Sequence, residues 1–262
     1  MDTLLIDHSE TNPGLTTITL NRPDKLNAIK NQVHLDLQAA CAELREDLVT
    51  RVVIFTGAGR AFTAGADLGP QGPRTPAAAP TPVDDVLAAR YASGIGNRTC
   101  DAIEGLDQVT IGAINGLTIG GGVVFTSCFD LRLAAQSAWF SIPEVDLNLP
   151  LTWDALPRLM RELGPARTKE LVLTCDRFSA EDAERWGLVN HVVPDDELVD
   201  RARELAAQLL EKNALAVALT KSTTRALQRL MVPAEATHSD ADYLLLSRLL
   251  RATAGADPDA AR

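Results

Sequence analysis

The chain is short of positive charge. Its 262 residues include 25 lysines and arginines against 35 aspartates and glutamates, which gives a formal net charge of −10. This acidic balance argues against non-specific nucleic-acid binding, because such binding requires a basic surface. We therefore expect no nucleic-acid partner, while a few local cations would still suffice to hold the phosphates of a small ligand.

Cysteine and histidine are also scarce. The four cysteines are scattered without a C-x-x-C pair, and the four histidines form no ligand-like cluster. This pattern favours reduced thiols in a cytoplasmic protein over a disulfide framework or a zinc site. We therefore expect a cytoplasmic location and no metal.

Long apolar runs are missing as well. No stretch approaches about 18 uninterrupted apolar residues, so no membrane span is expected. The N-terminal residues include the polar Asp2, Asp7 and His8, so no signal peptide is expected either. Apolar residues nevertheless make up 46% of the chain, enough to bury a sizeable core in one large domain or one domain with an appendage.

Apolar periodicity predicts alternating strands and helices followed by a helical region. Asn12-Pro13-Gly14 separates the first two strands, which favours a hairpin, and Ser179-Ala-Glu-Asp182 is typical of a capping box that opens a short helix. The predicted strands cover residues 4–6, 15–20, 51–56, 110–114, 131–134 and 189–193. The predicted helices cover residues 31–47, a segment after Gly121, and residues 198–210, 214–230 and 234–250. Two successive ββα-like units predict an α/β fold, with a core over residues 1–195 and a C-terminal helical region over residues 196–262.

Residues 69–83 interrupt this pattern. The segment GPQGPRTPAAAPTPV is too rich in proline and glycine for a helix or a central strand. We interpret it as a loop, either a lid or pocket wall or a tolerated insertion.

Three glycine-rich or proline-containing motifs follow apolar strands. They are AFTAGADL at residues 61–68, NGLTIGGGVV at residues 115–124 and FSIPEV at residues 140–145. Glycine lets a backbone approach a ligand closely, and a glycine turn before a helix leaves N–H groups free to bind an anion. The triple glycine alone is equally explained by a close helix–strand contact, and it matches neither a dinucleotide fingerprint nor a P-loop.

In this order and spacing, the motifs resemble the crotonase (enoyl-CoA hydratase/isomerase) superfamily. Asn21-Arg22-Pro23 and Asn27-Ala28 precede them, and Cys128-Phe129-Asp130 and LTCDRFSAEDAERWGLVNHVVP continue the likeness over roughly residues 3 to 212. The resemblance implies a crotonase-like spiral of repeated ββα units with a C-terminal helical trimerisation region. It further implies a homotrimer or hexamer, an acyl-CoA thioester as substrate and no other cofactor.

The resemblance also implies roles for individual residues. The backbone N–H groups of Ala66 and Gly121 would form an oxyanion hole for the thioester carbonyl, and Glu144 would be the catalytic acid–base. The other residues expected to bind the substrate are Lys25, Ala64, Asp67, Leu68, Gly120, Val124, Trp153 and Asp154. Arg22 is expected near the CoA phosphates with Lys25, although a solvated turn explains Lys25 equally well.

One position departs from the hydratase pattern. Hydratases carry a second glutamate where this chain has Val124, and valine cannot transfer a proton. A single glutamate is enough to move a proton from C2 to C4 of a 3-enoyl thioester, so isomerisation is the favoured hypothesis. The alternatives are a hydratase that uses Glu144 alone or with Asp154, a non-catalytic acyl-CoA-binding protein, and another reaction of the family.

Trp153 and Asp154 replace small residues that are usual in the family. They are interpreted either as part of a helix start capped by Thr152, or as parts of the acyl pocket that narrow it or supply a second acid. The C-terminal sequence ATAGADPDAAR also lacks the basic and aromatic tail with which many relatives cover a neighbour's CoA.

Overall fold

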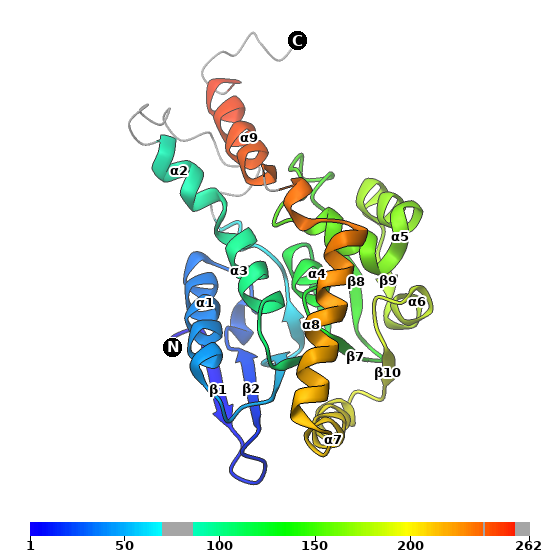
Figure 1. Ribbon diagram of the computed structural model, residues 1–262. Coiled ribbons are helices and arrows are strands. Elements are labelled where there is room, and N and C mark those ends of the chain that lie inside the picture. The colour runs from blue at the N-terminus through cyan, green and yellow to red at the C-terminus, as the bar shows by residue number, and fades with distance from the viewer. Residues whose placement is uncertain (70–85, 238, 255–262) are drawn as a thin grey trace.

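The computed structural model describes residues 1–69, 86–237 and 239–254. Within them the chain is an α/β structure with two sheets and C-terminal helices, as predicted (Figure 1). Except for Gly69, the proline-rich segment at 69–83 lies outside the described residues. The C-terminal tail beyond residue 254 lies outside them too.

The larger sheet has six strands in the order β1-β2-β3-β5-β7-β10. The strands are β1 (Leu4–His8), β2 (Leu15–Leu20), β3 (Val52–Gly57), β5 (Val109–Ile114), β7 (Leu131–Ala135) and β10 (His191–Val193). The first two form the predicted antiparallel hairpin, and the remaining neighbours are parallel. Strand β5 is buried along its whole length, which explains its continuous run of apolar and small residues.

A smaller sheet of four strands carries the three motifs. It runs in the order β4-β6-β8-β9, with β4 (Ala61–Thr63), β6 (Leu117–Ile119), β8 (Trp139–Ser141) and β9 (Phe178–Ser179). The first three are parallel to one another, and Thr118 pairs with Thr63 on one side and Phe140 on the other. Strands of two or three residues are too short to show a period of two, so the sequence did not predict them.

Helices cover both sheets. They are α1 (Asn31–Glu46), α2 (Val86–Ser93), α3 (Ile95–Glu104), α4 (Gly121–Thr126), α5 (Ala155–Thr174), α6 (Ala180–Trp186), α7 (Leu198–Leu210), α8 (Ala214–Met231) and α9 (Asp240–Ala254). The capping box is confirmed, since the Ser179 side chain accepts a hydrogen bond from the Asp182 N–H. The helix predicted over 234–250 is wrong in its first part: Ala234–Thr237 form a separate 3₁₀ turn after Pro233, and α9 begins at Asp240.

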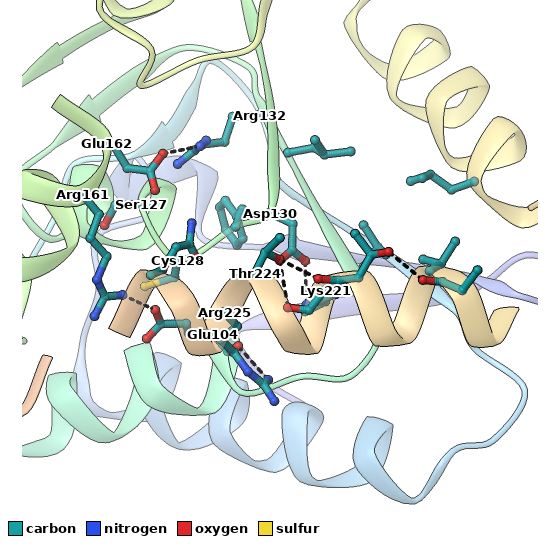
Figure 2. A pocket seen from close by; sticks show the side chains of 18 residues that line it. Glu104, Ser127, Cys128, Asp130, Arg132, Arg161, Glu162, Lys221, Thr224 and Arg225 are labelled. Atoms are coloured by element: carbon teal, nitrogen blue, oxygen red, sulfur yellow. Dashed lines mark hydrogen bonds and ion pairs between the residues drawn. The ribbon is translucent and has the colours of Figure 1, made fainter. Parts of the chain in front are cut away.

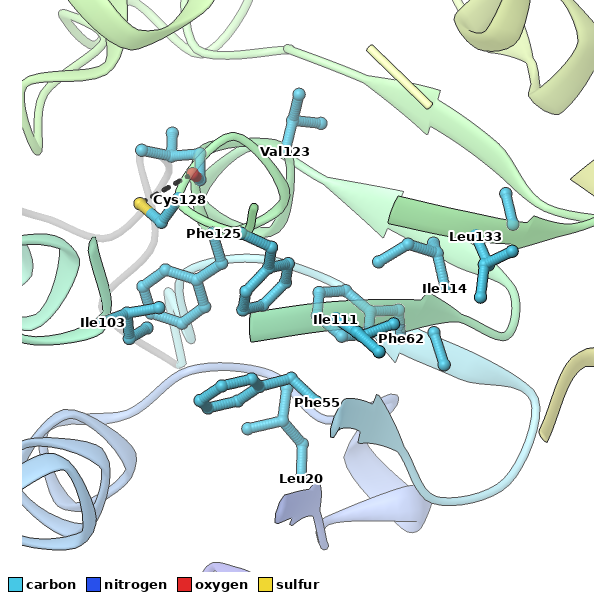
Figure 3. Packing of buried hydrophobic residues seen from close by; sticks show 14 of the residues in the cluster. Leu20, Phe55, Phe62, Ile103, Ile111, Ile114, Val123, Phe125, Cys128 and Leu133 are labelled. Carbon is cyan, nitrogen blue, oxygen red and sulfur yellow. Dashed lines mark hydrogen bonds between the residues drawn. The ribbon is translucent and has the colours of Figure 1, made fainter. Parts of the chain in front are cut away.

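The core lies between the two sheets and the helices packed on them. Phe55 of β3 and Phe62 of β4 both point into this core (Figure 3). Phe129 stacks on Phe55 with ring centroids 4.9 Å apart and makes an edge contact with Phe62, which joins the larger sheet to the smaller one. Helix α7 packs across β3, β5 and β7, and α9 lies beside α2 (Figure 1). The division at residue 195 stays a prediction. No helix in the described part of the chain combines the length and apolarity that crossing a membrane requires.

Candidate functional site

The three motifs converge at one edge of the smaller sheet. The turn of each motif follows the carboxyl end of β4, β6 or β8, and carboxyl ends of parallel strands meet at the same edge. The contact between the first two loops is close: a Cβ atom on Gly65 would overlap the carbonyl oxygen of Ile119 and lie 3.4 Å from the Gly121 nitrogen. Gly65 also has φ of +78°, so only glycine suits this position.

Two backbone N–H groups at this edge are available for a ligand. Gly65 donates to Thr63 Oγ1, Asp67 to the Ile29 carbonyl and Gly120 to the Ser141 carbonyl. Between these paired groups, the N–H groups of Ala66 and Gly121 have no acceptor among the described residues. Gly121 is also the first residue of α4, where N–H groups have no partner within the helix. The predicted oxyanion donors therefore lie on two loops in contact, each with its hydrogen free.

The Glu144 carboxylate lies beside them. A Cβ atom on Gly120 would be 2.5 Å from Glu144 Oε1, so the carboxylate rests over the Gly120 α-carbon, one residue before the Gly121 donor. Gly120 has φ of +52°, a second reason for glycine there. Glu144 as a whole is partly buried, but its Oε2 is enclosed and has no hydrogen-bond partner among the described residues. Burial raises the pKa of Glu144 from 4.5 to about 7, because the charged form loses its hydration.

Val124 lies one turn further along α4. Its N–H donates to the Gly120 carbonyl, and its side chain is 1% exposed within the hydrophobic core. The side chain at residue 124, in the first turn of α4, therefore cannot transfer a proton.

Trp153 packs directly against the donor loop. The three atoms closest to a Cβ on Gly121 would all belong to the Trp153 ring, at overlapping distances. The ring stacks on Phe125 with centroids 5.5 Å apart and meets the edge of His34 at 4.9 Å. Only 8% of Trp153 is exposed, so it forms part of the site's inner wall.

Asp154 faces a different set of groups. It caps α5 with φ of +53° and makes no side-chain capping bond, so Thr152 is not the helix cap considered from the sequence. The Asp154 Oδ1 accepts from the Thr237 hydroxyl, and its N–H donates to Asp240 Oδ2 at 2.7 Å. These contacts tie Asp154 to the chain around the start of α9.

The outer side of the site, away from the buried Trp153, is formed by exposed residues of the first motif. Ala66, Asp67 and Leu68 are exposed, while Ala64 is partly buried. Arg22 Nη1 pairs with Asp67 Oδ2 at 2.9 Å and also donates to the Ala28 carbonyl, which fastens the first loop to the N-terminal turn. Lys25 lies exposed in that same turn, at the end of the 3₁₀ helix Pro23–Lys25.

A cavity of about 430 Å³ lies elsewhere, between α8 and the ends of α4, β5 and β7 (Figure 2). None of the predicted site residues lines it. Lys221 crosses from α8 to bind Asp130 and the Gln108 carbonyl, each at 2.6 Å, and desolvation lowers the pKa of Lys221. The cavity is therefore lined by the ion pair between Lys221 and Asp130, which holds α8 against the larger sheet.

Several residues near the site were not identified from the sequence. Gly96, His34, Phe125 and Asp240 all surround Trp153 or its neighbours. They come from α3, α1, α4 and α9. Phe125 directly follows the second motif, whereas no local pattern links the other three to the motifs. No group of three or more His, Cys, Asp or Glu side chains suited to a metal ion occurs within the described ranges.

Comparisons with known proteins identify relatives of this chain. A model of the enoyl-CoA hydratase/isomerase family matches residues 10–249. A crotonyl-CoA hydratase of Syntrophomonas wolfei is 34% identical over 209 residues, which cover 79% of this chain and 76% of the relative. The crystal structure of an enoyl-CoA hydratase from Bacillus anthracis superposes with a TM-score of 0.77 at 32% identity, covering 94% of this chain and 90% of the other.

An isomerase is similar to the chain as well. The crystal structure of a monofunctional enoyl-CoA isomerase from M. smegmatis has a TM-score of 0.71 at 31% identity, covering 87% of this chain and 94% of the other. Similarity of this degree extends to proteins named for either reaction, so it does not by itself distinguish the two chemistries.

Proposed function

Because the chain belongs to the enoyl-CoA hydratase/isomerase family, we propose that it is an enoyl-CoA isomerase that works with one carboxylate, Glu144. The observation that carries this proposal is the position of that carboxylate. It rests over Gly120, next to the free N–H of Gly121, and its pKa of about 7 suits a group that must both take and return a proton near neutral pH.

The proposed reaction moves one proton and one double bond. Glu144 removes a proton from C2 of a 3-enoyl thioester, and the electron pair of the broken C–H bond delocalises onto the thioester oxygen. The N–H groups of Ala66 and Gly121 hold that oxygen, and one such donor contributes roughly 3 to 4 kcal/mol in a dry site. Glu144, now protonated, returns the proton to C4, which leaves the double bond between C2 and C3.

Hydration is the second candidate because proteins named hydratases are 32 to 34% identical to the chain. Hydration requires one group that activates water and a second group that delivers the α-proton. Val124 cannot serve, and the carboxylate of Asp154 is engaged by Thr237 near α9. Hydration would therefore rest on Glu144 alone, which makes isomerisation the better-supported reaction.

The test is an incubation of the protein with a trans-3-enoyl-CoA in D₂O, followed by mass spectrometry and NMR. We expect a shifted double bond, its loss in Glu144→Gln, and its retention in Asp146→Asn, which removes an exposed acid two residues away. A water adduct instead would identify a hydratase. An unchanged thioester that still binds in calorimetry would identify a non-catalytic acyl-CoA-binding protein and refute the proposal.

The proposals for the assembly and for the compartment are supported by separate observations. We propose a homotrimer or hexamer, because α8 exposes Leu215, Leu219, Leu227 and Leu230, whose spacing keeps them on one side of the helix. Light scattering after gel filtration tests this, and a monomer at working concentration would refute it.

We also propose a cytoplasmic location, since all four cysteines are buried and unpaired.

A further inference from the structure

The indole of Trp153 is held between two glycines. The three atoms closest to a Cβ on Gly121 belong to this ring, and the same holds for a Cβ on Gly96 of α3. Any side chain larger than hydrogen at either position would overlap the indole. Phe125 stacks on the ring at an interplanar angle of 28°, and His34 meets it edge-on at 84°. The ring is therefore packed on all these sides and fills the space behind the oxyanion donor.

The backbone at this position is unusual. Trp153 has φ of +68° and Asp154 has φ of +53°, a region that non-glycine residues seldom occupy and bulky residues least of all. Such conformations persist where the surrounding structure fixes them, and they concentrate at functional sites. Here the ordinary extended or helical backbone would aim the indole elsewhere.

One buried carboxylate binds the two segments that carry Trp153 and Gly96. Asp240, at the start of α9, is 6% exposed. Its Oδ2 accepts the N–H of Asp154, the residue after Trp153, at 2.7 Å. Its Oδ1 accepts from Asn97 Nδ2, the residue after Gly96, at 2.8 Å. The C-terminal helix thus holds the tryptophan and the wall of α3 together.

The acyl chain of a bound thioester has to start at this point. This inference rests on the proposed function, in which the Gly121 N–H binds the carbonyl oxygen of the thioester. The CoA part of the thioester then extends outward past residues 66–68, which are exposed. The chain beyond the reacting carbons then points inward, where the indole covers the Gly121 α-carbon. We propose that Trp153, positioned by Asp240, closes the inner end of the acyl site and restricts the substrate to short, crotonyl-sized acyl chains.

Binding of saturated thioesters tests this without depending on turnover. Calorimetry compares butyryl-CoA with decanoyl-CoA on the full chain and on the variants Trp153→Ala and Trp186→Ala. Trp186 lies on α6 against Phe178 and serves as the matched loss of an indole. We expect the wild type and Trp186→Ala to prefer butyryl-CoA. Trp153→Ala should move the preference toward decanoyl-CoA by at least tenfold, since each buried methylene changes affinity roughly fourfold.

Two further variants guard against misfolding and test the positioning role. Trp153→Leu replaces the indole with a smaller apolar side chain. It should shift the preference toward decanoyl-CoA as well, but by a smaller factor than Trp153→Ala. Asp240→Ala should do so as well, because it releases the backbone of Asp154, so that the indole is still present but no longer fixed across the acyl site. A merely structural role would lower stability without changing the ratio of the two affinities.

The outcomes separate this inference from the proposed function. Equal or tighter binding of decanoyl-CoA by the wild type, or an unchanged ratio in folded Trp153→Ala and Trp153→Leu, would overturn the inference alone. A short-chain preference released by Trp153→Ala in a protein without enoyl chemistry would support it and overturn the isomerase. Binding of neither thioester would overturn both.

Discussion

Replacing Glu144 by glutamine should stabilise the protein at alkaline pH while it removes activity. Burial raises the pKa of Glu144 from 4.5 to about 7, so folding favours the protonated, neutral form. The stability that this group contributes is complete below pH 4.5 and is lost as the pH rises through 7, where the folded protein must hold a buried carboxylate. Glutamine has nearly the same shape and never acquires that charge.

The magnitude follows from the pKa difference. A shift from 4.5 to about 7 corresponds to about 3 kcal/mol, at about 1.4 kcal/mol per pKa unit. We therefore expect Glu144→Gln to raise the free energy of unfolding by up to about 3 kcal/mol at pH 8 and by only about 1 kcal/mol at pH 5.5. Groups that titrate equally in both proteins cancel in this difference.

Urea unfolding of both proteins at pH 5.5, 7 and 8 measures it. Protein concentration must be equal throughout, because an assembly is stabilised by mass action. Asp146→Asn serves as the control, since it removes an exposed carboxylate next to the same loop and should change little. A stability gain that does not grow with pH, or none at pH 8, would show that Glu144 is not held in a desolvated position and would remove the physical basis for its proposed role.

Three further changes test the surrounding geometry. Gly120→Ala should lower the rate of double-bond shift by at least about 100-fold in the same assay, because its Cβ would strike the Glu144 carboxylate and its φ is positive; a rate near that of the wild type would contradict the placement. Val124→Glu should confer a measurable water adduct at a loss of stability, since it places a carboxylate in the core; a stable fold with no adduct would refute the lost-acid explanation. Lys221→Met should lower the free energy of unfolding by about 1.5 to 3 kcal/mol in urea titration, because it removes the hydrogen bonds of the buried Lys221 ammonium to Asp130 and to the Gln108 carbonyl; a loss below about 0.5 kcal/mol would mean that these bonds do not hold α8.

The sequence predicted the elements that bury a long periodic face. The hairpin at residues 4–20, the helix at 31–46 and the strands β3, β5 and β7 have enough residues for their apolar pattern to be visible. The three-residue strand β10 was predicted only as part of the longer apolar run at 189–193. The smaller sheet was missed because its strands have two or three residues. What holds them in place is pairing between segments that are distant in the sequence, such as Thr63 with Thr118 and Phe140 with Phe178, which no local pattern records.

The site was predicted to a similar degree. Resemblance to a family placed Ala66, Gly121 and Glu144 at one site, and the structure brings their loops together, although their roles remain proposals. The tryptophan wall could not be predicted in the same way. Trp153 was identified as unusual, but its contact with Gly96 depends on where α3 lies against the segment before α5, and its support by Asp240 depends on the course of the C-terminal helix.

The pair of glycines around Trp153 also constrains the order in which this protein can change. While the indole is present, an added methyl group at Gly96 or Gly121 overlaps it, so neither substitution can be accepted first. Once the indole has been replaced by a smaller side chain, the overlap with the ring is removed at both positions. Mutational paths that widen the site must therefore pass through residue 153, and the effects of the three positions will depend on one another rather than add.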